Sequence, residues 1–213
     1  MNIVIIDYDS GNLHSVAAAF NRVVSKHSPE GTVVVSREVS ALDDATHIVL
    51  PGVGAFADCI AGLNALTGMR EAMERRVLRD KMSFLGICVG MQMLLERGHE
   101  HGVHEGLGWI KGEVVPLAPT DKNLKIPHMG WNEITPTPQG AALFDGVTQG
   151  DHTYFVHSYH AACEERKNVL ATVEYGGEVV AAIGRDNIMG TQFHPEKSQH
   201  IGEKVLFNFL NMQ

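Results

Sequence analysis

The fold is decided by Phe84-Leu85-Gly86-Ile87-Cys88-Val89-Gly90-Met91-Gln92-Met93-Leu94-Leu95, where the hydrophobic pattern changes at the cysteine. Residues 82–87 form an apolar run with the length and composition of a buried parallel strand. Beyond Cys88 the apolar side chains recur at helical spacing, at Met91, Leu94 and Leu95. The pattern therefore predicts that Cys88 lies at the turn between a strand and a helix.

Two glycines flank this cysteine and complete the pattern G-x-C-x-G, the cysteine form of a nucleophile elbow. In so tight a turn, a Cβ atom at Gly86 or Gly90 would collide with neighbouring backbone, and strained backbone angles are expected at Cys88 itself. The thiol would point out of the sheet, and the N-terminus of the following helix would favour the thiolate. Taken alone, the stretch is equally compatible with a buried, inert cysteine.

The length and composition favour a single domain over residues 1–213, without a linker or an internal repeat. Seventeen basic against 25 acidic residues give a net charge of −8, with no basic cluster, so nucleic acid is not expected as a partner. No apolar run approaches membrane-spanning length and no basic leader is present, so no membrane association is expected. Three widely spaced cysteines argue against a disulfide framework. We therefore expect a cytoplasmic location.

The order of predicted elements indicates an α/β fold, with an open, mostly parallel twisted sheet flanked by helices and additional antiparallel strands in the C-terminal half. In the first half, strands are predicted at 2–6, 32–36 and 47–50, and helices at 13–24, 57–66 and 69–78. The second half predicts strands at 106–117, 126–135, 153–161, 169–175, 179–185 and 188–193, and a last helix at 201–210. A hairpin turn is predicted at 175–178.

Gln192-Phe193-His194-Pro195-Glu196 stands at the end of a predicted strand. Strand alternation would place His194 and Glu196 on one side, so that the carboxylate orients the imidazole, and the intervening proline restricts the backbone. Together with the cysteine, this pair would supply the nucleophile, base and orienting group that acyl transfer requires.

Pro51-Gly52-Val53-Gly54 follows another predicted strand, at the end of the sheet where α/β proteins bind ligands. A loop of this kind can present a backbone N–H group to a developing oxyanion, and the amide of Val89 can supply a second donor. An ordinary strand-ending turn is the alternative.

With these three components in this order, the chain resembles the class I (triad) glutamine amidotransferases. It is more closely similar to the glutaminase subunits of imidazole glycerol phosphate synthases, from its first strand to its last helix. The segments that carry this similarity are Pro51-Gly52-Val53-Gly54-Ala55-Phe56, Pro127-His128-Met129-Gly130-Trp131-Asn132, Tyr154-Phe155-Val156-His157-Ser158-Tyr159 and Phe193-His194-Pro195-Glu196-Lys197-Ser198. Asp9, where many relatives have glycine, and Val89, where leucine is more usual, depart from the pattern.

The resemblance implies a role for each matching position. The catalytic triad would be Cys88, His194 and Glu196. The oxyanion would be held by the amides of Val53 and Val89, and whether the 52–54 loop must flip to present the first is left open. Glutamine would be held by Gly52, Gly54, Gln92, Ser158 and Tyr159. Partner-facing positions would be Asn12, Met129, Trp131, Tyr154 and Lys197.

The same resemblance implies that L-glutamine is hydrolysed through a γ-glutamyl thioester on Cys88, without a cofactor or a metal. Ammonia would pass to a (β/α)8 cyclase subunit, the partner in a heterodimer, which makes imidazole glycerol phosphate and AICAR from the phosphoribosyl-formimino intermediate (PRFAR) in histidine biosynthesis. The alternatives are another class I glutaminase, a γ-glutamyl hydrolase, or a non-catalytic doubly wound binding module.

The remaining histidines, cysteines and tryptophans have simpler interpretations. The loop with His99, His101 and His104 is interpreted as solvated, not as a zinc site. His152 and His160 are expected at the surface, and His157 as structural support for the glutamine pocket. Packing roles are expected for Cys59, Cys163 and Trp109.

Overall fold

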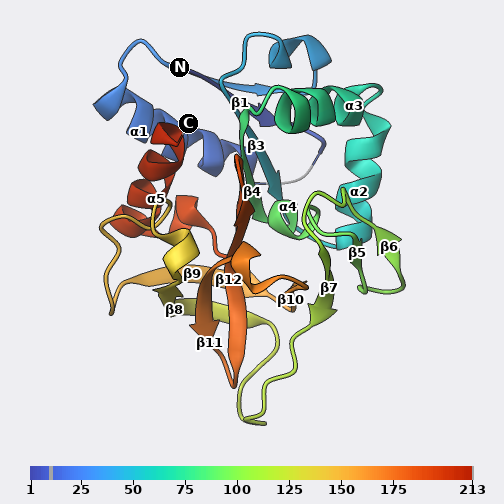
Figure 1. Ribbon diagram of the computed structural model, residues 1–213, viewed down its shortest axis with the longest axis vertical. Coiled ribbons are helices and arrows are strands. Elements are labelled where there is room, and N and C mark those ends of the chain that lie inside the picture. Colours follow the sequence, from blue (N-terminus) through green and yellow to red (C-terminus); the bar gives the residue numbers. More distant parts are fainter. Residues whose placement is uncertain (10–11, 213) are drawn as a thin grey trace.

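The chain is described by a computed structural model that covers residues 1–9 and 12–212 (Figure 1). One nine-stranded sheet runs through the molecule in the order β2-β1-β3-β4-β13-β12-β11-β8-β9. Its first five strands pair in parallel, and they are β2 (Thr32–Ser36), β1 (Asn2–Ile6), β3 (His47–Gly52), β4 (Ser83–Cys88) and β13 (Ile188–Thr191). The predicted open parallel sheet is therefore confirmed.

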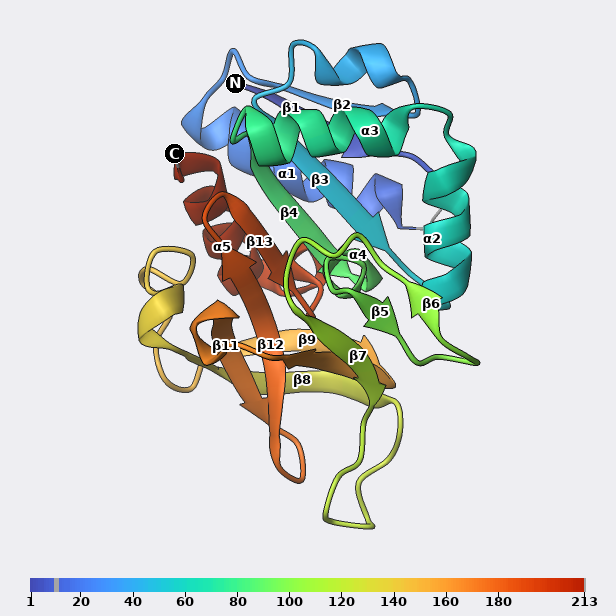
Figure 2. The same cartoon turned by 45° about the vertical axis from the view of Figure 1, so that its right-hand side comes forward.

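Helices cover both faces of the parallel strands (Figures 1 and 2). α1 (Leu13–His27) and α5 (Gln199–Asn211) lie side by side on one face. α2 (Phe56–Ala65) and α3 (Met69–Glu74), with a π-helical turn at Arg75–Arg79, lie on the other. The buried residues of α1 recur at helical spacing, at Val16, Ala19, Phe20, Val23 and Val24, so one apolar stripe packs on the sheet.

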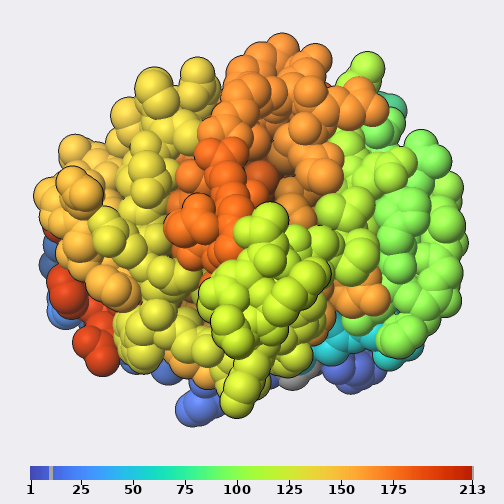
Figure 3. Space-filling model, turned by 90° about the horizontal axis from the view of Figure 1, so that it is seen from below, coloured from blue at the N-terminus to red at the C-terminus, as the bar shows by residue number. Residues whose placement is uncertain are grey.

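The C-terminal half adds antiparallel strands, as expected. β12 (Glu178–Arg185) and β11 (Val169–Glu174) form a hairpin whose turn contains Gly176 and Gly177, both at positive φ, and this confirms the turn predicted at 175–178. β8 (His128–Pro136) and β9 (His152–His157) complete the large sheet. Seen from below, this half and the yellow-green loop between β7 and β8 cover the end of the molecule (Figure 3).

A second, four-stranded sheet has the order β10-β7-β5-β6. Its strands are β10 (Tyr159–Cys163), β7 (Gly112–Pro116), β5 (Arg97–Gly98) and β6 (His104–Glu105). Short 3-10 helices occur at Val39–Leu42, Pro138–Gly140, Arg166–Asn168 and Pro195–Lys197. Among the residues that the structure describes, no helix is both long and apolar enough to cross a membrane.

Two predicted strands are wrong in extent. The strand predicted at 153–161 is two strands, β9 and β10, which belong to different sheets and are separated at Ser158. This change of sheet places the residues around Ser158 at the pocket described below. The strand predicted at 106–117 is reduced to β7, because the amide of Leu107 donates to the carbonyl of Met93 and that of Trp109 to Leu94.

The same contacts shorten the helix predicted after the cysteine. α4 ends at Gln92 (Val89–Gln92), and Leu94 and Leu95 lie beyond it. The carbonyls of residues 93–95 accept hydrogen bonds from residues 107–110, so these tertiary contacts replace further helical bonds. Trp109 itself is 3% exposed, in the core as expected.

Candidate functional site

Cys88 ends β4 and precedes α4 in a strained conformation, with φ 55° and ψ −111°. A Cβ atom on Gly90 would collide with the carbonyl oxygen of Leu50, and one on Gly86 would collide with the backbone of Gly90. The predicted reason for both glycines is therefore confirmed. This conformation places Cys88, which is 4% exposed, at the carboxyl end of the parallel strands, where it lines a pocket.

His194 and Glu196 form a buried pair beside this cysteine. Imidazole Nδ1 lies 2.8 Å from Oε1 of the carboxylate, and the two side chains are 2% and 1% exposed. The pairing comes from the 3-10 helix Pro195–Lys197, not from alternation along a strand, because β13 ends at Thr191. The Nδ2 amide of Asn12, which precedes α1, donates to the same Oε1 atom.

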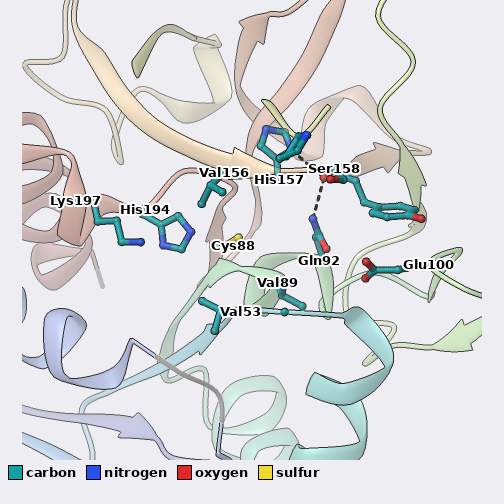
Figure 4. A pocket seen from close by; sticks show the side chains of 13 residues that line it. Val53, Cys88, Val89, Gln92, Glu100, Val156, His157, Ser158, His194 and Lys197 are labelled. Atoms are coloured by element: carbon teal, nitrogen blue, oxygen red, sulfur yellow. Dashed lines mark hydrogen bonds between the residues drawn. The ribbon is translucent and has the colours of Figure 1, made fainter. Parts of the chain in front are cut away.

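The imidazole of His194 lies beside the Cys88 sulfur (Figure 4). Burial lowers the pKa of His194, but its contacts with Cys88 and Glu196 outweigh burial and raise the pKa to about 9. Within the described residues, Nε2 of His194 makes no hydrogen bond. The ring is thus held through Nδ1, and Nε2 is left to exchange a proton with a neighbouring group.

The pocket has a volume of about 410 Å³. The catalytic, oxyanion and glutamine-binding positions that line it are Val53, Gly54, Cys88, Val89, Gln92, Ser158, Tyr159 and His194, and Lys197, predicted to face the partner, lines it as well. Gly52 lies behind the lining, paired with Cys88 across β3 and β4. Residues far apart in the sequence therefore meet where the parallel strands approach the turn between β9 and β10.

Gln92 is held on one side of this pocket (Figure 4). Its Nε2 amide donates to the carbonyl of Tyr159 at 3.0 Å and to Oε1 of Gln192 at 3.0 Å. Nε2 of Gln192 lies 3.8 Å from the sulfur of Cys88. The predicted placement of Gln92 one helical turn after the cysteine is confirmed.

Four lining residues were not predicted for the site: Glu100, Pro127, Val156 and His157, the last expected only as support. Glu100 accepts a hydrogen bond of 2.7 Å from the amide of Phe56 at the start of α2. No sequence signal indicates this, because the pairing of β5 with β7 brings the loop to the pocket. His99 in the same loop pairs with Glu113 at 2.6 Å, and the described residues contain no metal-binding group.

Of the predicted partner-facing residues, some are exposed at the surface around β8, whereas Asn12 contacts the buried His194–Glu196 pair. Met129 and Trp131 are 62% and 47% exposed on one face of β8, and the Trp131 ring contacts that of Tyr154. Lys197 is exposed above the Tyr154 ring, with Nζ 5.7 Å from its centroid. Asn12 instead contacts the carboxylate of the buried pair.

His160 is half-buried, not fully at the surface as expected. Its Nδ1 atom is buried, and burial lowers the pKa of the imidazole. His152 is exposed as expected. Cys59 is buried and Cys163 half-buried, and burial raises the pKa of the Cys163 thiol to about 11.

Comparison with known proteins agrees with this geometry. Residues 4–212 match the family described as "Glutamine amidotransferase class-I". The chain is 50% identical over 210 residues to imidazole glycerol phosphate synthase subunit HisH of Rhodospirillum rubrum. The aligned part covers 99% of this chain and 98% of the relative. The chain is 49% identical over 213 residues to the same subunit of Agrobacterium fabrum, and the aligned part covers 99% of this chain and 98% of the relative.

Two solved structures show the same fold. A crystal structure of a glutamine amidotransferase has a TM-score of 0.71 and 16% identity, covering 98% of this chain and 97% of the other. A glutamine amidotransferase from Thermotoga maritima has a TM-score of 0.65 and 16% identity, covering 92% and 76%.

The elbow, the buried histidine–carboxylate pair and the match over nearly the whole length lead to one class: the chain belongs to the class-I glutamine amidotransferases. Within that class it belongs to the family of the imidazole glycerol phosphate synthase subunit HisH. It is a glutaminase subunit in histidine biosynthesis, and it works with a partner subunit.

Proposed function

We propose that Cys88, His194 and Glu196 are the catalytic triad of this glutaminase. The Cys88 thiolate attacks the side-chain carbonyl carbon of L-glutamine, and His194 donates its proton to the leaving nitrogen as the C–N bond breaks. Ammonia and a γ-glutamyl thioester result. Water then attacks the thioester with His194 as the base, which releases glutamate and restores the thiol. Glu196 keeps the imidazole in the required orientation.

The oxyanion formed in each step is assigned to two backbone amides, those of Val53 and Val89. Both residues line the pocket beside Cys88, one after β3 and one after β4. Donors of this kind stabilise charge that develops only in the transition state. The backbone of residues 52–54 supplies the first donor.

The body of the glutamine substrate is assigned to the wall of the pocket opposite the triad. Gly54, Gln92, Ser158 and Tyr159 supply polar groups there, with Gly52 behind them. The α-ammonium group of glutamine is assigned to Glu100, whose carboxylate is already fixed by the α2 amide. Glutamine carries an ammonium group and a carboxylate on its α-carbon, whereas a simple amide carries neither. Because Glu100 attracts the ammonium group, this wall favours an amino acid over a simple amide.

The partner is assigned as a (β/α)8 cyclase subunit in a cytoplasmic heterodimer, with residues 1–213 acting as one domain. The surface of this chain that contacts the partner includes Met129, Trp131, Tyr154 and Lys197, with Asn12 at the edge. Exposed Met and Trp side chains of this size favour an interface. Ammonia released at Cys88 would enter the barrel of the partner and not bulk solvent.

One observation carries the proposal: a strained cysteine, a buried imidazole and a carboxylate converge on one pocket. The test is glutamate release from L-glutamine by the chain alone, and then with a cyclase subunit and its substrate. Low activity alone and a large rise in the full mixture support a partner-gated glutaminase. Vigorous activity that ignores the partner would leave the triad chemistry standing but overturn the assigned partner.

A further inference from the structure

Two buried histidines outside the proposed triad lie next to the glutamine pocket. His128 begins β8 and His157 ends β9, and the two residues are paired across these antiparallel strands. Nδ1 of His128 lies 3.0 Å from Nε2 of His157. His157 lines the pocket, whereas His128 stacks between the rings of Phe155 and Tyr175. The triad chemistry uses neither of them.

Asn132 determines the hydrogen-bonding role of His128. The Oδ1 atom of Asn132 accepts from the amide of Glu133 at 2.9 Å, and its Nδ2 donates to the carbonyl of Glu174 at 3.0 Å. These two bonds fix the orientation of the side-chain amide. Nδ2, which also lies 3.3 Å from Nε2 of His128, is therefore a donor, so this ring nitrogen is the acceptor.

The other end of the pair leads to the same assignment. Nδ1 of His157 lies 2.9 Å from the carbonyl oxygen of Tyr159, which can only accept. His157 therefore carries a hydrogen on Nδ1, and its Nε2 accepts from Nδ1–H of His128. Both rings are neutral with the hydrogen on Nδ1. A further proton on either Nε2 would face an N–H donor and break the chain.

This chain of bonds continues into the pocket. The Tyr159 carbonyl that accepts from His157 also accepts from Nε2 of Gln92 at 3.0 Å (Figure 4). The second Nε2 hydrogen of Gln92 is used by Gln192. With both of its amide hydrogens committed, Gln92 presents its carbonyl oxygen to the pocket, as an acceptor for a substrate N–H group.

We propose that His128 and His157 are positioning residues, a neutral one-directional relay from Asn132 to the Tyr159 carbonyl that aims the Gln92 oxygen at the bound amino acid. This inference rests on the proposed glutaminase function of the pocket. Burial supports it, because it lowers the pKa of His128 to about 4 and that of His157 to about 3. The relay acts on substrate binding and leaves the chemical step unchanged.

Two substitutions at one position separate this role from simple packing. His128→Phe keeps a ring between Phe155 and Tyr175 but removes the donor to His157. His128→Asn keeps a side-chain N–H donor and removes the ring. In the complex with a cyclase subunit, His128→Phe should raise the KM for glutamine about tenfold and leave kcat within about twofold. His128→Asn should keep the KM within about threefold of wild type despite a lower Tm.

The matched control is His47→Phe, the same change at a buried histidine on β3 that contacts Phe209. It should leave the KM unchanged. The relay would be overturned if the KM rose in His128→Asn, which loses the ring, and not in His128→Phe, which loses the donor. If the wild-type complex hydrolyses no glutamine, the proposed function is overturned instead, and the spectra described next decide the relay.

The tautomers can be read without any turnover. Proton–nitrogen correlation spectra of the full chain labelled with ¹⁵N-histidine distinguish Nδ1–H from Nε2–H rings. At pH 7, His128 and His157 should both be neutral and protonated on Nδ1. An Nε2–H tautomer or an imidazolium at either ring would overturn the relay, even where a variant fails to fold.

Discussion

His194 and His157 are buried to nearly the same degree at one pocket, yet their protonation is shifted in opposite directions. The side chain of His194 is 2% exposed and His157 is 6% exposed. The pKa of His194 is raised to about 9, whereas that of His157 is lowered to about 3. Burial lowers the pKa of both rings, so burial does not explain the difference.

The difference lies in what each ring contacts. His194 pairs with the carboxylate of Glu196 and lies beside the Cys88 thiol, two groups that favour a charged imidazole. His157 instead pairs with a backbone carbonyl and the neutral ring of His128, and its ring packs against Phe155. Under the proposed mechanism the chain separates two tasks: the end of the parallel sheet transfers protons, and the antiparallel strands hold a fixed, uncharged wall.

The largest expected effect follows from Cys88→Ala. Without the nucleophile, glutaminase activity should fall by more than about 10⁴-fold, while ammonia-dependent synthesis by the complex is retained. The pKa of His194 should also fall, since one of the groups that raises it is removed, while that of His157 stays low. Glutamate release and NMR titration measure these effects. Cys163→Ala is the control, and retained turnover in Cys88→Ala would rule out the mechanism.

The next effect compares the two histidines directly. His194→Asn should lower kcat by about 10³-fold, because it removes the proton-transfer group. His157→Phe should act mainly on the KM for glutamine and change kcat by less than about fivefold, because it removes the donor to the Tyr159 carbonyl. Steady-state kinetics of the complex measures both. Equal losses of kcat would show that the division of tasks between the two rings is wrong.

Stability at alkaline pH tests the charged histidine. The pKa of His194 is about 9 in the folded chain against 6.5 as its ordinary value, so the folded state binds more protons between these values. Its contribution is complete below pH 6.5 and is lost as the pH rises through about 9. Urea unfolding across this range should show a falling free energy of unfolding, with a shallower fall in Cys88→Ala. An equal slope in both proteins would contradict the assigned cause.

Stability at acid pH tests the neutral pair with the opposite sign. The pKa values of His128 and His157 are about 4 and about 3 in the folded chain, below the ordinary 6.5. The unfolded state therefore binds more protons, and stability should fall as the pH drops from 6.5 towards 3. His128→Phe removes one such group and should weaken this acid dependence. His152→Phe, at an exposed histidine, should leave it unchanged.

Most of the fold could be predicted from the sequence because its signals are local. Strand β1 and strand β2 have the predicted bounds, since short runs rich in β-branched residues favour a strand over a helix. The elbow was predictable because steric crowding at Gly86 and Gly90 leaves little freedom. The splitting of residues 153–161 between two sheets was not, because it depends on which distant strand each half pairs with.

In the site, too, features set by neighbouring residues could be predicted, and features set by long-range packing could not. The positions of Cys88 and Gln92 follow from residues close in sequence, and both line the pocket. Glu100 and the contact of Asn12 with Glu196 were not predicted, because each depends on a loop brought across the molecule by tertiary packing. The proposed His128–His157 relay depends on the register of β8 on β9, which no local pattern encodes.

The smallest expected effect concerns Asn12, the partner-facing position that contacts the charged pair. Its amide donates to the same Glu196 oxygen that holds His194, so Asn12→Ala leaves a buried carboxylate with one donor fewer. Since His194 keeps its own bond, kcat for glutamine should fall only about three- to tenfold, with the KM unchanged. The matched control is Asn21→Ala on α1, the helix that Asn12 precedes; the Asn21 amide donates to the carbonyl of Ala17. A rise in KM with normal kcat would place Asn12 with the uncharged wall, because only the charged pair acts on the chemical step.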